Sequence, residues 1–144
     1  MATKLFTDKE REIIVNAIKT AELNTSGEIR VHVEHSCPEN VLDRAAYIFE
    51  KLKMHQTALR NGVLFYLSVD DRQFAILGDA GINARVREGF WEEIKETMLA
   101  FFKEGNLAGG MEKGILMAGE QLKAFFPYQS DDVNELSDEI SFGK

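Results

Sequence analysis

The sequence predicts an α/β fold, namely an α/β/α sandwich whose small mixed sheet carries helices on both faces. Residues 28–34 alternate between apolar and polar, residues 63–69 form a dense apolar run, and apolar stripes at helical spacing lie before, between and after them. A strand, a helix and a strand in this order indicate a parallel βαβ unit, which is right-handed by strong preference. With 144 residues, we expect one domain over residues 1–127 and a mobile acidic tail over 128–144.

The first helix is predicted to begin after Thr7. Thr7 and Glu10 form a capping-box pattern, in which each side chain satisfies a free backbone N–H at the helix start. The turn residues 24–27 end the helix. Its apolar stripe is Ile13, Ile14, Ala17, Ile18 and Ala21.

The first strand, residues 28–34, has one apolar and one polar face. Ile29, Val31 and Val33 alternate with polar residues, so we expect this strand near a sheet edge or partly uncovered. A second capping-box pattern, Ser36 to Glu39, predicts a second helix that runs to about Leu59.

The second strand, residues 63–69, is apolar on both faces and is predicted to be central in the sheet. The pair Asp70-Asp71 then makes a short turn into an antiparallel third strand, residues 74–77, which ends at Gly78.

Two further helices follow. One spans Phe90 to Phe102 and ends at Gly105 as a left-handed cap, and the last spans Met111 to Phe125 before Pro127. Glycines inside a helix are unfavourable, so those of the last helix indicate close packing or a late start: Gly109, Gly110, Gly114 and Gly119.

Charge and composition exclude several classes of function. A net charge of −7 argues against nucleic-acid binding, which depends on Lys and Arg meeting phosphates. The N-terminus has no apolar signal segment, and no run approaches the ~20 apolar residues of a transmembrane helix. We therefore expect a cytoplasmic protein, and its single cysteine, Cys37, permits no internal disulfide.

The predicted topology brings three polar residues to one end of the sheet. The parallel strands start beside Glu28 and Asn61, and the antiparallel third strand returns to this end at Asp79. Two carboxylates and an amide oxygen suit a hard cation such as Ca²⁺ or Mg²⁺. The opposite end offers Asp70 and Asp71 as an alternative site. Aspartates in turns also satisfy local backbone N–H groups, which is the competing interpretation.

Other reactive residues lack a supporting pattern. We expect surface roles for His32, His35 and His55, because no metal-binding spacing such as HExxH is present. Cys37 lies near a predicted helix N-terminus, where a thiolate is favoured, but no partner motif accompanies it.

The order of several short motifs resembles the TPM domain, the family of thylakoid-lumen phosphatase-like proteins and their bacterial relatives. The resemblance covers about residues 5 to 127. The motifs are Ser26-Gly27-Glu28-Ile29, Asn61-Gly62-Val63-Leu64, Asp71-Arg72-Gln73, Gly78-Asp79-Ala80-Gly81-Ile82 and Gly114-Ile115…Gly119…Leu122.

This resemblance implies an α/β/α sandwich with a groove in which acidic residues bind divalent cations, often Ca²⁺. For plant members it also implies weak acid phosphatase activity. Glu28, Asn61 and the Gly78–Gly81 loop match the recurrent motifs. The acidic residue usual before the first helix is replaced by Leu5-Phe6-Thr7, which weakens the transfer of the full site.

Three functional hypotheses follow. The first is a stand-alone domain that binds Ca²⁺ or Mg²⁺ through Glu28, Asn61 and Asp79. The second is a metal-assisted phosphomonoesterase in which Arg60 steadies the anion. The third is a protein-interaction module that uses the half-polar first strand or the acidic tail, with an unknown partner.

Overall fold

The computed structural model describes residues 6–23, 25–37, 39–127 and 140–143. The elements in chain order are α1 (Asp8–Ala21), β1 (Glu28–Glu34), α2 (Val41–Lys51), the short 3₁₀ helix η2 (Met54–Gln56), β2 (Gly62–Ser68), β3 (Gln73–Gly78), α3 (Ala80–Asn83), α4 (Phe90–Lys103), α5 (Leu107–Phe125) and β4 (Ser141–Phe142).

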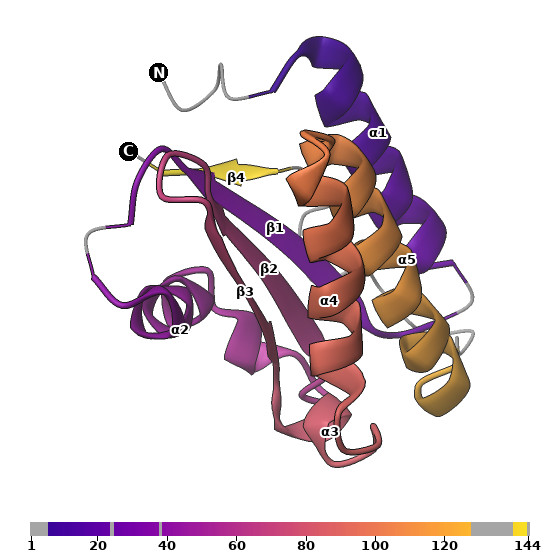
Figure 1. The fold of residues 1–144 in the computed structure, drawn as a ribbon. Helices are drawn as coiled ribbons and strands as arrows, with labels where there is room; N and C mark the ends of the chain where they lie inside the picture. Colours follow the sequence, from indigo (N-terminus) through magenta and orange to yellow (C-terminus); the bar gives the residue numbers. More distant parts are fainter. Residues whose placement is uncertain (1–5, 24, 38, 128–139, 144) are drawn as a thin grey trace.

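The sheet has the order β3-β2-β1-β4. β1 pairs in parallel with β2, and β3 returns antiparallel to β2, as predicted. Helices α1, α4 and α5 cover one face and α2 lies on the other, so the predicted α/β/α sandwich is confirmed (Figure 1).

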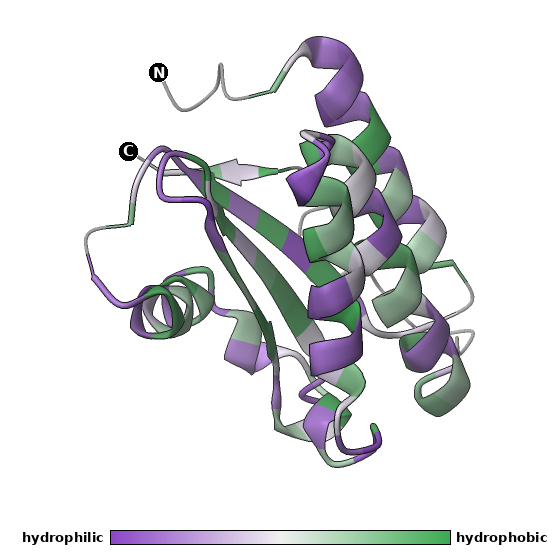
Figure 2. Ribbon diagram, viewed as in Figure 1, coloured by the Kyte–Doolittle hydropathy of each residue, from purple (hydrophilic) through white to green (hydrophobic). Residues whose placement is uncertain are grey.

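The main core lies between the sheet and the α1–α4–α5 layer. Ile29, Val31 and Val33 of β1 are fully buried there. Every residue of β2 is buried, which confirms its predicted central position. The two strands differ in hydropathy, because β2 is mostly hydrophobic whereas β1 alternates between hydrophobic and hydrophilic residues (Figure 2).

The polar face of β1 is not open to solvent. Its side chains face the α2 side of the sheet, yet Glu28, His32 and Glu34 retain only 2%, 5% and 1% of their exposure. Among the described residues, β1 lies next to the sheet edge, with the two-residue β4 beyond it. The alternating pattern and the predicted position near the sheet edge are therefore confirmed, although the polar face is covered, and the surface role expected for His32 was wrong.

The second helix differs from its prediction at both ends. Asn40, and not Ser36, caps α2, because its side-chain oxygen accepts hydrogen bonds from the backbone of Leu42 and Asp43. The helix ends at Lys51, and Lys53 turns the chain with a left-handed φ of 59°. The predicted Ser36–Glu39 capping box and the end near Leu59 were wrong.

Other local predictions are confirmed. Thr7 and Glu10 make both hydrogen bonds of the capping box. Gly105 has a φ of 80° directly after α4, where a left-handed cap was expected. The hairpin turn closes through a hydrogen bond from Arg72 N–H to Val69 O, and its left-handed residue is Arg72, with a φ of 54°.

The glycines of α5 mark close helix packing and not a late start, since α5 begins at Leu107. An ideal Cβ at Gly114 would lie 2.4 Å from the sulfur of Met98. At Gly119 it would lie 2.8 Å from the Cα of Ala21 in α1. These glycines let α5 approach α4 and α1 closely.

The C-terminal region adds a strand that the sequence did not predict. Ser141 and Phe142 form β4 beside β1, whereas residues 128–139 of the expected tail lie outside the described residues. In the described part of the chain, no helix combines the length and hydropathy needed to span a membrane.

The packing of Gly119 predicts that Gly119→Ala destabilises the protein, although alanine is the better helix former. The added methyl group meets backbone atoms of α1 that cannot move aside, so we expect a loss of about 1–3 kcal/mol in the free energy of unfolding. Urea denaturation measures it. Lys113→Ala, at an exposed position of the same helix, is the control with little change. A more stable Gly119→Ala protein would show that this contact is not tight.

Candidate functional site

The backbones of Glu28, Asn61 and Asp79 converge at one end of the sheet. Glu28 N–H donates to Asn61 O at 3.4 Å, and Asp79 N–H donates to Gly62 O at 2.9 Å. The strand register explains this meeting, because Glu28 pairs with Gly62 while Val63 pairs with Gly78. All three side chains are buried, with 2%, 1% and 7% exposure.

A close backbone approach holds Asp79 in place. Gly81 N–H donates to Arg60 O at 2.8 Å, and a Cβ on Gly81 would lie 2.1 Å from Leu59 O. Only glycine therefore lets α3 pack against the 59–60 loop. Asp79 caps α3 by accepting a hydrogen bond from Ala80 N–H at 2.7 Å.

Asp79 also forms a bidentate ion pair with Arg60. Arg60 Nε and Nη2 donate to the two carboxylate oxygens at 2.7 and 2.8 Å. Burial raises the pKa of Asp79, but the hydrogen bonds from Arg60 and Ala80 outweigh this effect, so the pKa falls below its usual value. Asp79 is thus a carboxylate at neutral pH, while half of the Arg60 side chain stays exposed.

Asn61 has an unusual environment for a buried amide. Its Nδ2 donates to Ser26 Oγ at 3.4 Å, and its backbone N–H donates to Thr57 Oγ1 at 3.3 Å. Its Oδ1 is buried and has no hydrogen-bond partner among the described residues. Such an atom is rare in folded proteins and calls for an explanation such as an ion or water.

The alternative acidic pair at the hairpin turn is arranged differently. Asp71 accepts hydrogen bonds from Ser68 Oγ at 2.8 Å and from Cys37 N–H, so it fastens the loop before α2 to the turn. Asp70 is largely exposed and lines a groove of about 770 Å³ together with Arg72 and Lys103. Two cations beside Asp70 oppose metal binding there.

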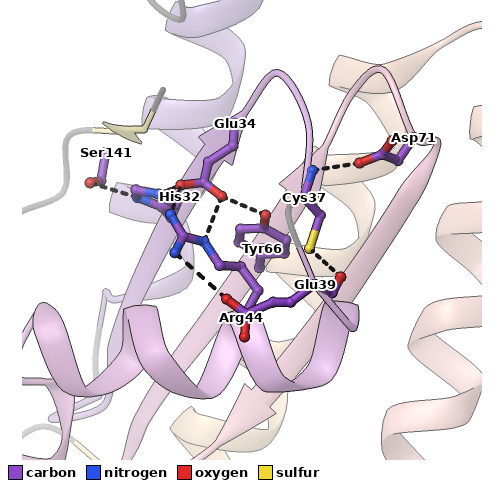
Figure 3. A network of polar contacts seen from close by, with 8 residues as sticks. All are labelled: His32, Glu34, Cys37, Glu39, Arg44, Tyr66, Asp71 and Ser141. Atoms are coloured by element: carbon purple, nitrogen blue, oxygen red, sulfur yellow. Dashed lines mark hydrogen bonds and ion pairs between the residues drawn. The ribbon is translucent and has the colours of Figure 1, made fainter.

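A second polar cluster, which the sequence did not reveal, surrounds the buried carboxylate of Glu34 (Figure 3). Arg44 donates to both of its oxygens at 3.0 and 2.6 Å, and Tyr66 OH donates at 2.6 Å. His32 Nε2 lies 3.3 Å from Glu34, and its Nδ1 lies 2.9 Å from Ser141 Oγ. We call these five residues the Glu34 cluster.

The Glu34 cluster shifts several pKa values. Burial raises the pKa of Glu34, but hydrogen bonds from Arg44, Tyr66 and His32 outweigh it and bring the pKa to about 2. Burial and the neighbouring carboxylate raise the pKa of Tyr66. Burial lowers the pKa of His32. At neutral pH the cluster holds an ionised Glu34 paired with Arg44.

Only one sequence signal pointed toward this cluster, namely the polar residues that alternate along β1. Arg44 and Tyr66 come from α2 and β2, so no local spacing links them to Glu34. Cys37 lies nearby and is half-buried, and its thiol donates to Glu39 O at 3.0 Å.

Acidic residues do not gather into an all-carboxylate centre in the described part of the chain. There, no group of three or more His, Cys, Asp or Glu side chains is arranged to hold a metal ion. A cation at the Glu28 end would therefore depend on two carboxylates, the Asn61 amide and water, and its binding there stays a prediction.

The sequence model of the TPM domain matches residues 2–121. The chain therefore belongs to the TPM domain family. A comparison with curated proteins finds no match.

Among solved structures, the BA42 protein from the psychrophilic bacterium Bizionia argentinensis is 46% identical, with a TM-score of 0.89 over 96% of each chain. The N-terminal domain of a P. gingivalis protein is 18% identical, with a TM-score of 0.70 over 87% of this chain and 82% of that one. The N-terminal domain of the cg2496 protein from Corynebacterium glutamicum is 13% identical, with a TM-score of 0.68 over 92% and 83%. The last two likenesses show the shared fold alone.

The Glu34 cluster predicts acid-sensitive stability. A folded-state pKa near 2, against 4.5 for the unfolded chain, contributes about 3 kcal/mol above pH 4.5. Because the folded pKa is the lower one, this contribution is lost as the pH falls from 4.5 toward 2. Glu34→Gln should cost roughly 3 kcal/mol at pH 7 because Arg44 loses its buried carboxylate partner and keeps only the longer ion pair with Glu39.

Urea denaturation of wild type and Glu34→Gln at pH 7, 4 and 3 measures this effect, and the difference between them should shrink with acid. Asp70→Asn, at an exposed carboxylate, should match wild type at every pH. A Glu34→Gln deficit that stays constant down to pH 3 would contradict the assigned pKa.

Proposed function

We propose that this TPM domain binds a divalent cation, Ca²⁺ or Mg²⁺, at the end of the sheet formed by Glu28, Asn61 and Asp79. The observation that carries the proposal is the buried Oδ1 of Asn61, which has no partner among the described residues. An unsatisfied buried acceptor costs about 1–3 kcal/mol, and a cation or a water molecule of its hydration shell would satisfy it.

The donor set suits a hard cation. Glu28 in β1 and Asp79 after β3 would supply carboxylate oxygens, and Asn61, which precedes the intervening strand β2, would supply a neutral amide oxygen. Ca²⁺ and Mg²⁺ both prefer oxygen ligands and commonly complete their coordination with water. The absence of histidine or cysteine from this set disfavours zinc.

Arg60 is the competitor of the cation in this proposal. It now occupies both oxygens of Asp79, so a metal ion must displace its guanidinium. The displacement is feasible because half of the Arg60 side chain is already exposed and can reach solvent without unpacking the core. Arg60 would thus hold Asp79 as a carboxylate until the cation arrives.

A second candidate function is metal-assisted hydrolysis of a phosphomonoester. It is supported by the same displacement, because a guanidinium released from Asp79 can bind a phosphate while the metal polarises the phosphoryl oxygen. The described residues near Asp79 offer no evident nucleophile, which ranks this candidate below cation binding.

If Arg60 and the cation compete for Asp79, removing Arg60 and removing a proposed ligand should change the cation affinity in opposite directions. Titration of ¹⁵N-labelled protein with CaCl₂ or MgCl₂ should shift the amides of Glu28, Gly62 and Asp79. Glu28→Gln and Asn61→Ala should each weaken binding by tenfold or more, whereas Arg60→Gln should tighten it because Asp79 is freed.

Asp71→Asn, which removes a carboxylate from the other end of the sheet, is the matched control and should bind like wild type. Cation-induced shifts confined to the Asp70–Asp71 turn, or an Arg60→Gln protein with weakened affinity, would count against the proposed site.

The phosphatase candidate predicts hydrolysis of p-nitrophenyl phosphate that requires a divalent cation and falls at least tenfold in Asp79→Ala. The reason is that Asp79 would hold the metal. Release of p-nitrophenol with and without EDTA measures it. Equal rates in wild type and Asp79→Ala would remove this site from any phosphatase mechanism while leaving cation binding to its own titration.

A further inference from the structure

The last described residues of the chain lie along the outer edge of β1. β4 runs parallel to β1, with Ser141 opposite His32 and Phe142 opposite Val33. Gly143 N–H donates to Val33 O at 2.9 Å. A ladder of this length contributes few backbone hydrogen bonds, so its side chains must supply most of the specificity.

Side chains of this segment alternate between the two faces of the sheet, as strand geometry requires. Ile140 is 6% exposed and belongs to the main core, and Phe142 packs against the same core. Ser141 points the other way, where its Oγ lies 2.9 Å from His32 Nδ1 (Figure 3). The outer edge of β1 thus contacts apolar and polar side chains of the C-terminal segment in alternation.

Gly143 is the most selective position. An ideal Cβ there would lie 2.2 Å from Glu34 Oε2 and 2.6 Å from Glu34 Cγ. Glu34 cannot move aside, because Arg44 and Tyr66 hold its carboxylate. The Glu34 cluster therefore leaves no space for a side chain at position 143, so only glycine fits there.

We propose that the outer edge of β1 is a strand-addition site, which reads the pattern apolar-Ser-apolar-Gly and is filled by residues 140–143 of the chain itself. Addition of an extended segment to a sheet edge is a common mode of peptide recognition, in which backbone bonds give affinity and side-chain pockets give specificity. The same contacts make the site able to take this sequence when it is supplied as a separate peptide.

Two observations separate the segment from the domain that it contacts. The TPM domain match ends at residue 121, so β4 lies outside the matched region. Within the described part of the chain, β4 pairs only with β1, so the pairing of β1, β2 and β3 does not depend on it. The segment can leave without breaking the other strand pairs.

The test uses the full chain carrying Gly143→Val, whose own segment cannot dock against Glu34. In ¹⁵N spectra, the amides of His32 and Val33 should shift away from their wild-type positions, while those of Ala75 and Ile76 in β3, at the opposite edge of the sheet, stay. A synthetic peptide of residues 137–144, SDEISFGK, should return the His32 and Val33 signals toward wild type.

The matched control peptide, SDEISFVK, should leave these signals unchanged. Wild-type protein should bind SDEISFGK at least tenfold more weakly than the variant, because its own segment competes. The proposal is overturned if Gly143→Val keeps wild-type signals at β1, if both peptides act alike, or if neither acts.

A second variant, Ile140→Asp, tests the proposal independently in case Gly143→Val disturbs folding. Ile140→Asp removes the buried apolar anchor of the segment and leaves the receiving edge intact. It should release the segment and respond to the same peptide in the same way. Failure of the SDEISFGK peptide with this folded variant also overturns the proposal.

Discussion

The parallel pairing of β1 with β2 is the constraint on which both polar sites depend. Its register runs from Glu28 opposite Gly62 to Glu34 opposite Ser68. One end of this ladder brings Glu28 beside Asn61, and the hairpin returns Asp79 to the same end. The other end places Glu34 beside Tyr66 and under α2. A shift by one residue would move each polar side chain of β1 into the apolar core.

The two ends use the same chemical pair, an arginine and a carboxylate, in opposite ways. At Glu34 the carboxylate is 1% exposed and Arg44 only 20%, and Tyr66 and His32 complete its hydrogen bonds. This pair is enclosed and shapes the receiving edge for the C-terminal segment. At Asp79 the arginine is 51% exposed, so solvent competes for it, and under the proposed function an incoming cation would replace it. The two ion pairs thus differ in the exposure of the arginine: the buried Arg44–Glu34 pair is structural, whereas the exposed Arg60–Asp79 pair is the one that the proposed cation would replace.

The polar face of β1 links these two ends through one strand. Glu28 lies at the proposed cation site, while His32 and Glu34 contact the C-terminal segment. His32 and Glu34 can be buried in this row because Arg44, Tyr66 and Ser141 supply hydrogen-bond partners from three other elements. The apolar residues of the same strand meanwhile join the main core. One alternating strand thereby packs the core with its apolar face and carries both proposed binding sites on its polar face.

Local patterns in the sequence determined the long helices and the strands β1, β2 and β3 of the mixed sheet. The Thr7–Glu10 capping box, the apolar run of β2 and the left-handed Gly105 each act within a few residues, so they could be recognised without the fold. The connection rules for parallel and antiparallel strands then sufficed to bring Glu28, Asn61 and Asp79 to one end.

Only the tertiary structure decided the start of α2, the burial of Glu34 and the existence of β4. Ser36 and Asn40 are both competent caps, and contacts of the loop with Asp71 accompany the later start. A glutamate on an alternating strand looks solvated until partners from α2 and β2 surround it. A two-residue strand has no periodicity of its own, so its position follows from His32, Val33 and Glu34, which are more than a hundred residues away in the chain.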